Sequence, residues 1–161
     1  MSVSFPPLAA PVDGRQSPAA LDLQRGVGRA LLRHDFACLS EVTVASGRRA
    51  DVMALGPDGA IWIVEIKSSV ADYQSDRKWP EYRDWCDRLL FAVAPGFPLE
   101  LLPEDVGLIV ADRFGGEIVR EAPVHPLSGA RRKALTLRFG RVAARRMQAI
   151  CDPELIEALL D

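Results

Sequence analysis

The residues best suited to chemistry stand in the stretch 61–69, IWIVEIKSS. Its first four residues are all apolar, which predicts a central β-strand covered on both faces. Glu65 and Lys67 follow, and because they are two positions apart they point to the same face of that strand. Charged groups in a covered strand are costly unless they are paired or bind a metal. The stretch therefore predicts either an ion pair or a functional site.

The turn before this strand predicts which residue lies opposite Glu65. The connection 56–60, GPDGA, suits a three-residue hairpin loop. Its Pro and Asp fit the central positions of a type I turn, and its second Gly fits the left-handed position that follows. In that register the first Gly faces the Ala, and Asp51 lands directly opposite Glu65. A two-residue loop would instead turn Asp51 to the other face of the sheet.

Asp51, Glu65 and Lys67 together predict metal-assisted phosphodiester hydrolysis. Two facing carboxylates repel each other, and partial burial raises the cost of charging both. A divalent cation removes that cost, and Mg²⁺ takes one or two carboxylates together with waters and a substrate phosphate. Lys67 adds a mobile positive charge for a phosphate oxygen or an activated water. E-x-K triplets are common, so a salt bridge between Lys67 and either carboxylate remains the alternative.

The flanking patterns predict the elements that position this cluster. Ser17 and Pro18 are typical of a helix start, and apolar residues at helical spacing continue to about Arg33. After three extended segments and a polar stretch, a second helix is expected from about Pro80 through Leu89. A basic helix and a short last helix close the chain. The expected strands are 38–45, 49–55, 60–68, 89–94, 106–112 and 118–122, and the last two helices are 129–149 and 153–160.

This order predicts an α/β (α+β) fold with a mixed central sheet. An antiparallel meander comes first, and a helical crossover then leads to another strand. The apolar runs 61–64, 90–93 and 108–110 fit the central strands of the sheet, and helices are expected on its faces.

The cluster also carries a family resemblance. The spacing AD(x13)EIK, on a hairpin after a helix and a strand, resembles the PD-(D/E)XK nuclease superfamily. The fuller stretch RRADVMAL…VEIKSS…DRKWPEYRDWCDRLLFAV…VGLIVAD…EIVREAPVH, within residues 21–147, resembles the MmcB family of bacterial DNA repair proteins. The resemblance implies a restriction-endonuclease-like α-β-β-β-α-β core. It also implies that Asp51, Glu65 and the Ile66 carbonyl bind Mg²⁺ or Mn²⁺ and that Lys67 is catalytic.

Two departures from the superfamily pattern bear on the metal. Ala50 stands in place of the Pro in the superfamily name, which leaves the ligands untouched. Many members carry a Glu on the first helix, whereas this chain offers Asp22 and Gln24 there. A second metal ion would therefore need another ligand, and Glu41 is a substitute if its strand faces the site.

The segment after the motif offers further accessory residues by the same resemblance. In RecB-like relatives a polar residue and a Tyr four positions later approach the active site. Lys78 and Tyr82 match that spacing, and Gln74 is an alternative polar group. The competing interpretation is that Trp79, Tyr82 and Trp85 pack on the sheet while Lys78 is a solvated helix start.

A basic segment near the C-terminus predicts contact with DNA. The net charge is only −2, but residues 123–150 contain seven Lys or Arg and no acidic residue. Arg131, Arg138 and Arg145 recur every seven positions, which predicts a cationic stripe that binds phosphates without reading sequence. Arg141 and Arg146 extend the stripe. The expected apolar side consists of Leu135, Phe139, Val142 and Met147, and a solvated amphipathic helix is the alternative.

Length and composition fit one domain, expected over 17–161 after a flexible lead at 1–16. No apolar run approaches the ~20 residues of a membrane span, and the N-terminus lacks the pattern of a signal peptide. Three widely spaced Cys favour a reducing, cytoplasmic location over structural zinc. His34 and His125 are the only histidines and carry no catalytic signature.

Two functions follow from these patterns. The first is a Mg²⁺-dependent nuclease of DNA repair. The second is a DNA-binding or scaffold protein of the same fold that cuts nothing. DNA is the expected partner in both cases, no membrane is expected, and a homodimer or contact with other repair proteins stays open.

Overall fold

The computed structural model describes residues 16–154, which fold around one six-stranded sheet with its strands in sequence order. The strands are β1 (Ala37–Thr43), β2 (Arg49–Leu55), β3 (Ile61–Lys67), β4 (Arg88–Val93), β5 (Gly107–Asp112) and β6 (Gly115–Arg120). The α-helices are α1 (Pro18–Leu32), α2 (Val70–Ser75) and α3 (Gly129–Cys151), and the 3₁₀ segments are η1 (Trp79–Trp85) and η2 (Leu99–Leu101).

The sheet is mixed, as the sequence predicts. Strands β3, β4 and β5 are parallel neighbours, and the other three pairs are antiparallel. The crossover from β3 to β4 passes through α2 and η1, so these two segments connect parallel strands. The expected α+β fold with helices flanking a mixed sheet is confirmed, and the three predicted central strands are β3, β4 and β5.

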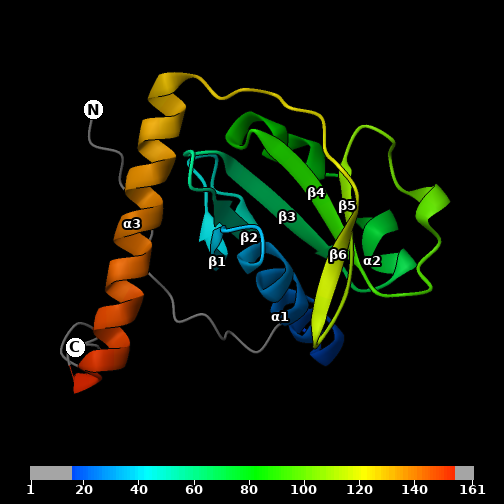
Figure 1. Ribbon diagram of the computed structural model, residues 1–161, viewed down its shortest axis with the longest axis horizontal. Coiled ribbons are helices and arrows are strands. Elements are labelled where there is room, and N and C mark those ends of the chain that lie inside the picture. The colour runs from blue at the N-terminus through cyan, green and yellow to red at the C-terminus, as the bar shows by residue number, and fades with distance from the viewer. Residues whose placement is uncertain (1–15, 155–161) are drawn as a thin grey trace.

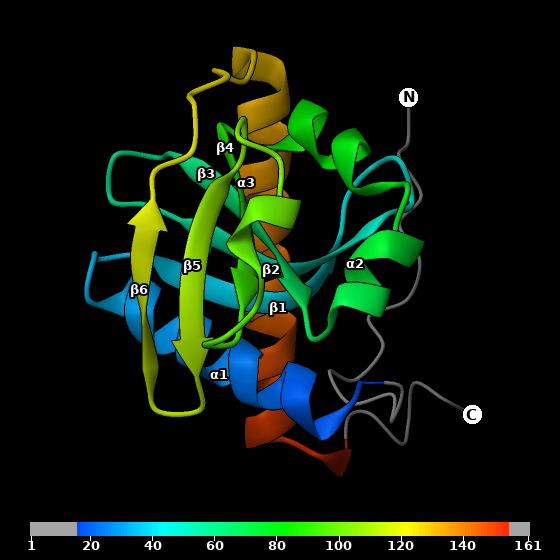
Figure 2. The ribbon, with the colours of Figure 1, turned by 90° about the vertical axis from the view of Figure 1, so that its right-hand side faces the viewer.

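Two hydrophobic layers cover the sheet. On one face α1 contributes Leu23, Val27 and Leu31, which pack with Val64 and Ile66 of β3. On the other face η1 contributes side chains that pack with Ile63 and Phe91 among others. The direction of the strands changes steadily across the sheet, from β6, which is vertical in Figure 2, to β1, which runs nearly across the view. This change is the regular twist of a β-sheet.

The hairpin register of β2 and β3 is the one that the turn predicts. Gly59 adopts a left-handed φ of +82°, and the Gly56 amide donates to the Ala60 carbonyl at 2.8 Å. Leu55 then faces Ile61, and Val52 faces Val64. Continuing the same register by one residue puts Asp51 opposite Glu65.

The segment after β3 differs from the prediction. The polar stretch forms α2, because the Ser69 hydroxyl accepts the Asp72 amide and caps a helix start. The helix expected from Pro80 through Leu89 is the shorter 3₁₀ segment η1. It ends at Trp85 because Cys86 is extended (φ −147°), and Leu89 lies in β4 opposite Ile63 of β3.

Helix α3 runs beside β1, on the opposite side of the molecule from α2 (Figure 1). Its buried residues are Leu135, Arg138, Phe139 and Val142. Met147 was expected on this apolar side, but it is 60% exposed. Arg146 takes the packed position instead, because its guanidinium donates to the carbonyls of Ser40 (2.6 Å) and Glu41 (3.0 Å).

Two predicted segments fall largely outside the described residues, namely the lead at 1–16 and the last helix at 153–160. Across residues 16–154, none of the helices combines the length and the apolar character that a membrane crossing requires.

Candidate active site

The hairpin brings Asp51, Glu65 and Lys67 to one end of the β2–β3 pair. The Asp51 amide donates to Glu65 Oε1 at 3.1 Å, and the Ile66 amide donates to Asp51 Oδ2 at 2.8 Å. Each carboxylate thus reaches the backbone of the neighbouring strand. Glu65 and Lys67 are each 4% exposed, whereas Asp51 is half-buried. The predicted juxtaposition is therefore present, and the catalytic roles of these residues stay a prediction.

The electrostatics of the two carboxylates are unfavourable. Burial raises the pKa of Asp51 to about 6, against the opposing effect of the Ile66 amide and the Lys67 charge. Burial, followed by the charge of Asp51, raises the pKa of Glu65 well above its ordinary value. The buried surroundings of both carboxylates thus favour the protonated form over the ionised form. Carboxylates with raised pKa values are characteristic of functional sites, although structural clusters also produce them.

Lys67 forms its ion pair with a carboxylate other than Asp51 and Glu65. Its ammonium lies 2.5 Å from Asp76 Oδ2, just beyond the C-terminus of α2, and 5.7 Å from the ring centre of Phe91. The alternative from the sequence was a salt bridge between Lys67 and Asp51 or Glu65. The direct partner of Lys67 is instead a third carboxylate, contributed by the crossover.

The donor set suits a hard divalent cation. Glu65 Oε2 and Asp51 Oδ1 accept no hydrogen bond from any residue between 16 and 154, so each carboxylate keeps an oxygen for a ligand. No group of three or more His, Cys, Asp or Glu side chains in this range is arranged to hold a metal. An ion here would depend on two carboxylates, the Ile66 carbonyl and water, which is the kind of coordination that Mg²⁺ accepts.

Glu41 lies beside this cluster. Strands β1 and β2 pair Ser40 with Val52 and Val42 with Ala50, so Glu41 stands across from Asp51. Its backbone has a left-handed φ of +51°, a conformation that costs free energy in a residue with a side chain. Its Oε1 lies 3.2 Å from Gln16 Nε2 and 3.4 Å from Arg49 Nη2. Glu41 is thus near the site and already engaged.

The other accessory candidates lie in different settings. Tyr82 is buried, and its hydroxyl donates to the Arg49 carbonyl at 2.7 Å, so it packs on the sheet as the competing interpretation expects. Lys78 and Gln74 are exposed. Asp22 and Gln24 belong to α1, which covers the opposite face of the sheet from Glu65.

Two carboxylates of the crossover are absent from the sequence-based site. Asp76 pairs with Lys67, and Asp72 Oδ2 accepts the Ser68 amide at 3.0 Å. The pattern Ser69-x-x-Asp72 resembles a capping box and is the signal that could have predicted α2. No local signal in the sequence links Asp76 to Lys67.

The predicted DNA-binding arginines divide into two groups. Arg138 is 9% exposed, and its Nε donates to the Thr43 carbonyl, so this residue docks α3 on β1 rather than facing a ligand. Arg131 lies 4.9 Å from the ring centre of Trp85 and donates to the Asp84 carbonyl at 2.8 Å. Arg141 and Arg145 are exposed and remain available for phosphate contact.

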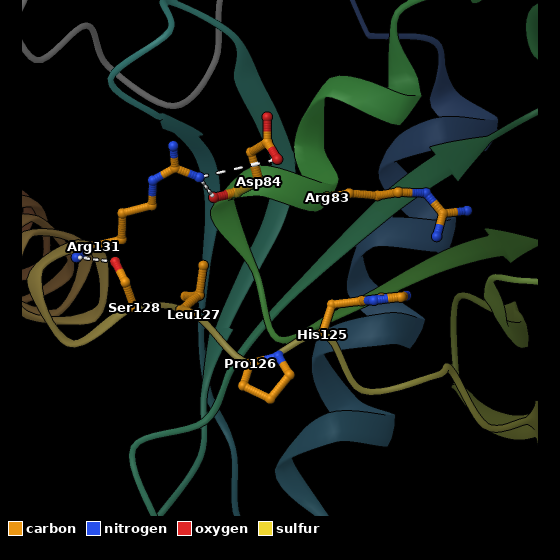
Figure 3. Close-up of a pocket in the computed structure, with 7 residues that line it drawn as sticks. All are labelled: Arg83, Asp84, His125, Pro126, Leu127, Ser128 and Arg131. Atoms are coloured by element: carbon orange, nitrogen blue, oxygen red, sulfur yellow. Dashed lines mark hydrogen bonds and ion pairs between the residues drawn. The ribbon is translucent and has the colours of Figure 1, made fainter.

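A surface cavity of about 430 Å³ lies at the N-terminal end of α3 (Figure 3). Its cationic lining residues are already engaged, since Arg131 reaches Asp84 and Arg83 pairs with Asp105 at 2.6 Å. The lining residues are Arg83, Asp84, His125, Pro126, Leu127, Ser128 and Arg131, and none of them belongs to the carboxylate cluster.

Comparison with known proteins places the chain in a family. Residues 8–154 match the family described as DNA repair protein MmcB-like, so the chain belongs to the MmcB-like family. A solved structure, the SPO1766 protein of unknown function from Silicibacter pomeroyi, is 51% identical with a TM-score of 0.83. The similarity covers 87% of this chain and 95% of that one. A comparison with curated proteins finds no match.

Proposed function

We propose that this protein is a Mg²⁺-dependent deoxyribonuclease of the PD-(D/E)XK superfamily that acts in DNA repair. The observation that supports this most is the facing pair Asp51 and Glu65, whose pKa values are raised and whose charges interact with that of the buried Lys67. Family membership supports the repair role and DNA as the partner. The phosphodiester chemistry is our inference from the residues.

Each residue has a separate role in this proposal. Asp51 and Glu65, with the Ile66 carbonyl, would hold the ion, which supplies Lewis acidity and an activated water when bound. Lys67 presents its ammonium to the negative charge that develops on the phosphate oxygens. The exposed Arg141 and Arg145 hold the DNA backbone through phosphates, which provides affinity without sequence preference.

The direct test is cleavage by the purified full chain. Branched, nicked and single-stranded DNA would be incubated with Mg²⁺ or Mn²⁺, and product would be measured for wild type, Asp51→Asn, Glu65→Gln and Lys67→Ala. We expect cleavage by wild type and a loss of at least ~100-fold in each variant. Glu104→Gln, which changes an exposed acid in another loop, serves as the matched control. Cleavage that persists in Lys67→Ala would contradict the assignment.

The second candidate is a DNA-binding protein of the same fold that does not cut. The observation that favours it is the 2.5 Å contact between Lys67 and Asp76, which engages the ammonium that cleavage would require. Metal binding separates the two functions. If the nuclease proposal is right, Mn²⁺ raises the melting temperature of wild type by ligand linkage and leaves Glu65→Gln unchanged. DNA binding without any metal-induced shift would favour the non-cutting protein.

A further inference from the structure

Lys67 could pair with any of three carboxylates, and it pairs with the one outside the hairpin. Asp51 and Glu65 are both close enough for their charges to interact with Lys67. The short contact, however, is the 2.5 Å distance from Lys67 Nζ to Asp76 Oδ2. A buried ammonium requires a partner, and the crossover segment supplies it.

Asp76 is itself held in place by the backbone around it. Its Oδ1 accepts the Lys78 amide at 2.8 Å, at the start of η1. On the same segment, Asp72 accepts both the amide (3.0 Å) and the hydroxyl (3.3 Å) of Ser68. Two carboxylates of the crossover therefore attach residues 72–78 to the end of β3. Asp76 has little freedom to move away from Lys67.

This pairing decides which charges of the site are left uncompensated. Lys67 and Asp76 together are neutral. Asp51 and Glu65 then stand as two facing carboxylates with no direct cationic partner among residues 16–154. If Asp76 were absent, the buried ammonium would turn to one of these two carboxylates. That carboxylate would then be less available to a divalent ion.

We propose that Asp76 is a positioning residue that holds the Lys67 ammonium away from Asp51 and Glu65, leaving both carboxylates for a divalent cation. This inference rests on the proposed function, because it takes Asp51 and Glu65 as the metal ligands. It adds a residue of the crossover to the site and gives α2 a function. Asp76 acts through Lys67 and does not bind the ion.

The first experiment measures Mn²⁺ affinity by calorimetry in a double-variant cycle of Asp76→Asn and Lys67→Met. Asp76→Asn is close to isosteric and keeps an oxygen for the Lys78 amide. Circular dichroism and the melting temperature establish that the variant is folded before it is titrated. We expect Asp76→Asn alone to weaken Mn²⁺ binding roughly tenfold. In the Lys67→Met background, Asp76→Asn should weaken Mn²⁺ binding no more than the control variant Asp72→Asn does.

The matched control is Asp72→Asn. It removes a carboxylate from the same segment, and the partner of that carboxylate is Ser68 rather than Lys67. It therefore reports the effect of removing one nearby negative charge. An equal loss of affinity for Asp76→Asn with and without Lys67 would overturn the inference, since it would make Asp76 a ligand. No loss in either background would overturn it as well.

The second experiment needs neither metal nor cleavage. The protonated ammonium of a buried, paired lysine exchanges slowly enough to be observed by ¹H–¹⁵N NMR, whereas exposed lysines exchange rapidly. We expect one such signal in wild type and in Asp72→Asn, and its loss in Asp76→Asn and Lys67→Met. Absence of the signal in wild type would overturn the inference. A normal signal in a protein that binds no Mn²⁺ would instead contradict the proposed function and the metal part of this inference.

Discussion

Carboxylates lie beside both ends of strand β3, and the two ends differ in how many hydrogen bonds these carboxylates accept. At the start of the strand, Asp87 accepts the Ile61 amide at 2.8 Å, the Leu127 amide at 2.9 Å and two guanidinium nitrogens of Arg132, each at 2.7 Å. Burial would raise the pKa of Asp87, but these donors lower it below its ordinary value. At the other end, Asp51 and Glu65 have one amide donor each and raised pKa values.

The difference separates a carboxylate that the fold itself satisfies from two carboxylates that the fold leaves short of donors. Asp87 joins the start of β3, the start of β4 and the beginning of α3, and all of its ligands come from the chain itself. Asp51 and Glu65 receive too few donors for their charge, so folding alone does not explain them. Depth of burial is similar for Asp87 and Glu65, at 6% and 4% exposure. The number of donors therefore distinguishes the two sites better than burial does.

The largest effect is expected at Asp87. Asp87→Ala leaves the amides of Ile61 and Leu127 without their side-chain acceptor. It also removes the carboxylate from Arg132, whose guanidinium then keeps only the Gly59 carbonyl. We expect the free energy of unfolding to fall by about 3 kcal/mol or more, measured by urea denaturation at pH 7.5. A loss under about 1 kcal/mol would remove the contrast between the two ends of β3.

The next largest effect is a gain in stability, expected at Asp51. Asp51→Asn keeps an oxygen for the Ile66 amide and removes a charge that burial disfavours. Without metal at pH 8 we expect this variant to be more stable than wild type, on the order of 1 to 3 kcal/mol. Urea denaturation in the presence of a chelator measures it. The matched change Asp87→Asn should be destabilising, and a shared sign would contradict our distinction.

The pH dependence sharpens the same contrast. The pKa of Asp51 is about 6 in the folded protein against 3.8 ordinarily, so the folded state binds the proton more tightly. Its stability therefore falls as pH rises from about 4 to about 6. The advantage of Asp51→Asn should shrink as pH drops through this window and be absent near pH 4. The contribution of Asp87, whose pKa is lowered, should persist there and be lost only at lower pH.

The arginines of α3 divide into exposed residues and residues bonded to the chain, and the exposed ones should have the smallest effects on stability. Arg141 and Arg145 make no hydrogen bond or ion pair within the described part of the chain. Arg141→Ala with Arg145→Ala should change stability by less than about 0.5 kcal/mol and lower the salt dependence of DNA binding by roughly one to two phosphate contacts. Arg146→Ala should instead lower stability by more than that and leave the salt dependence of DNA binding unchanged, because Arg146 donates to the backbone of β1. Fluorescence anisotropy at several salt concentrations distinguishes them.

The sequence predicts those features of the protein that local chemistry decides. The GPDGA turn sets the β2–β3 register, because Gly59 adopts the left-handed conformation that the loop requires. The central strands follow from apolar runs that need cover on both faces. The helix start at Ser17 follows from its side chain, which accepts the Ala20 amide.

The sequence does not predict the features that contacts between distant segments decide. The spacing of residues in α3 shows which side chains share a face, but it does not show that Arg146 rather than Met147 packs on the sheet. The aliphatic part of an arginine can be buried while its guanidinium reaches backbone carbonyls. The pairing of Lys67 with Asp76 depends on the path of the crossover, which no residue pattern specifies.

The hairpin loop has a consequence for how members of this family should be compared. Thirteen residues separate Asp51 from Glu65, and the three-residue turn between the strands sets the register that puts both on one face. Substitutions in the loop are tolerable wherever they preserve the turn, whereas a length change that shifts the strand pairing by one residue turns Asp51 away from Glu65. A homologue with such a length change would retain every motif residue and still have no assembled site. The strand register at this hairpin, and not the motif residues alone, should therefore be compared among homologues.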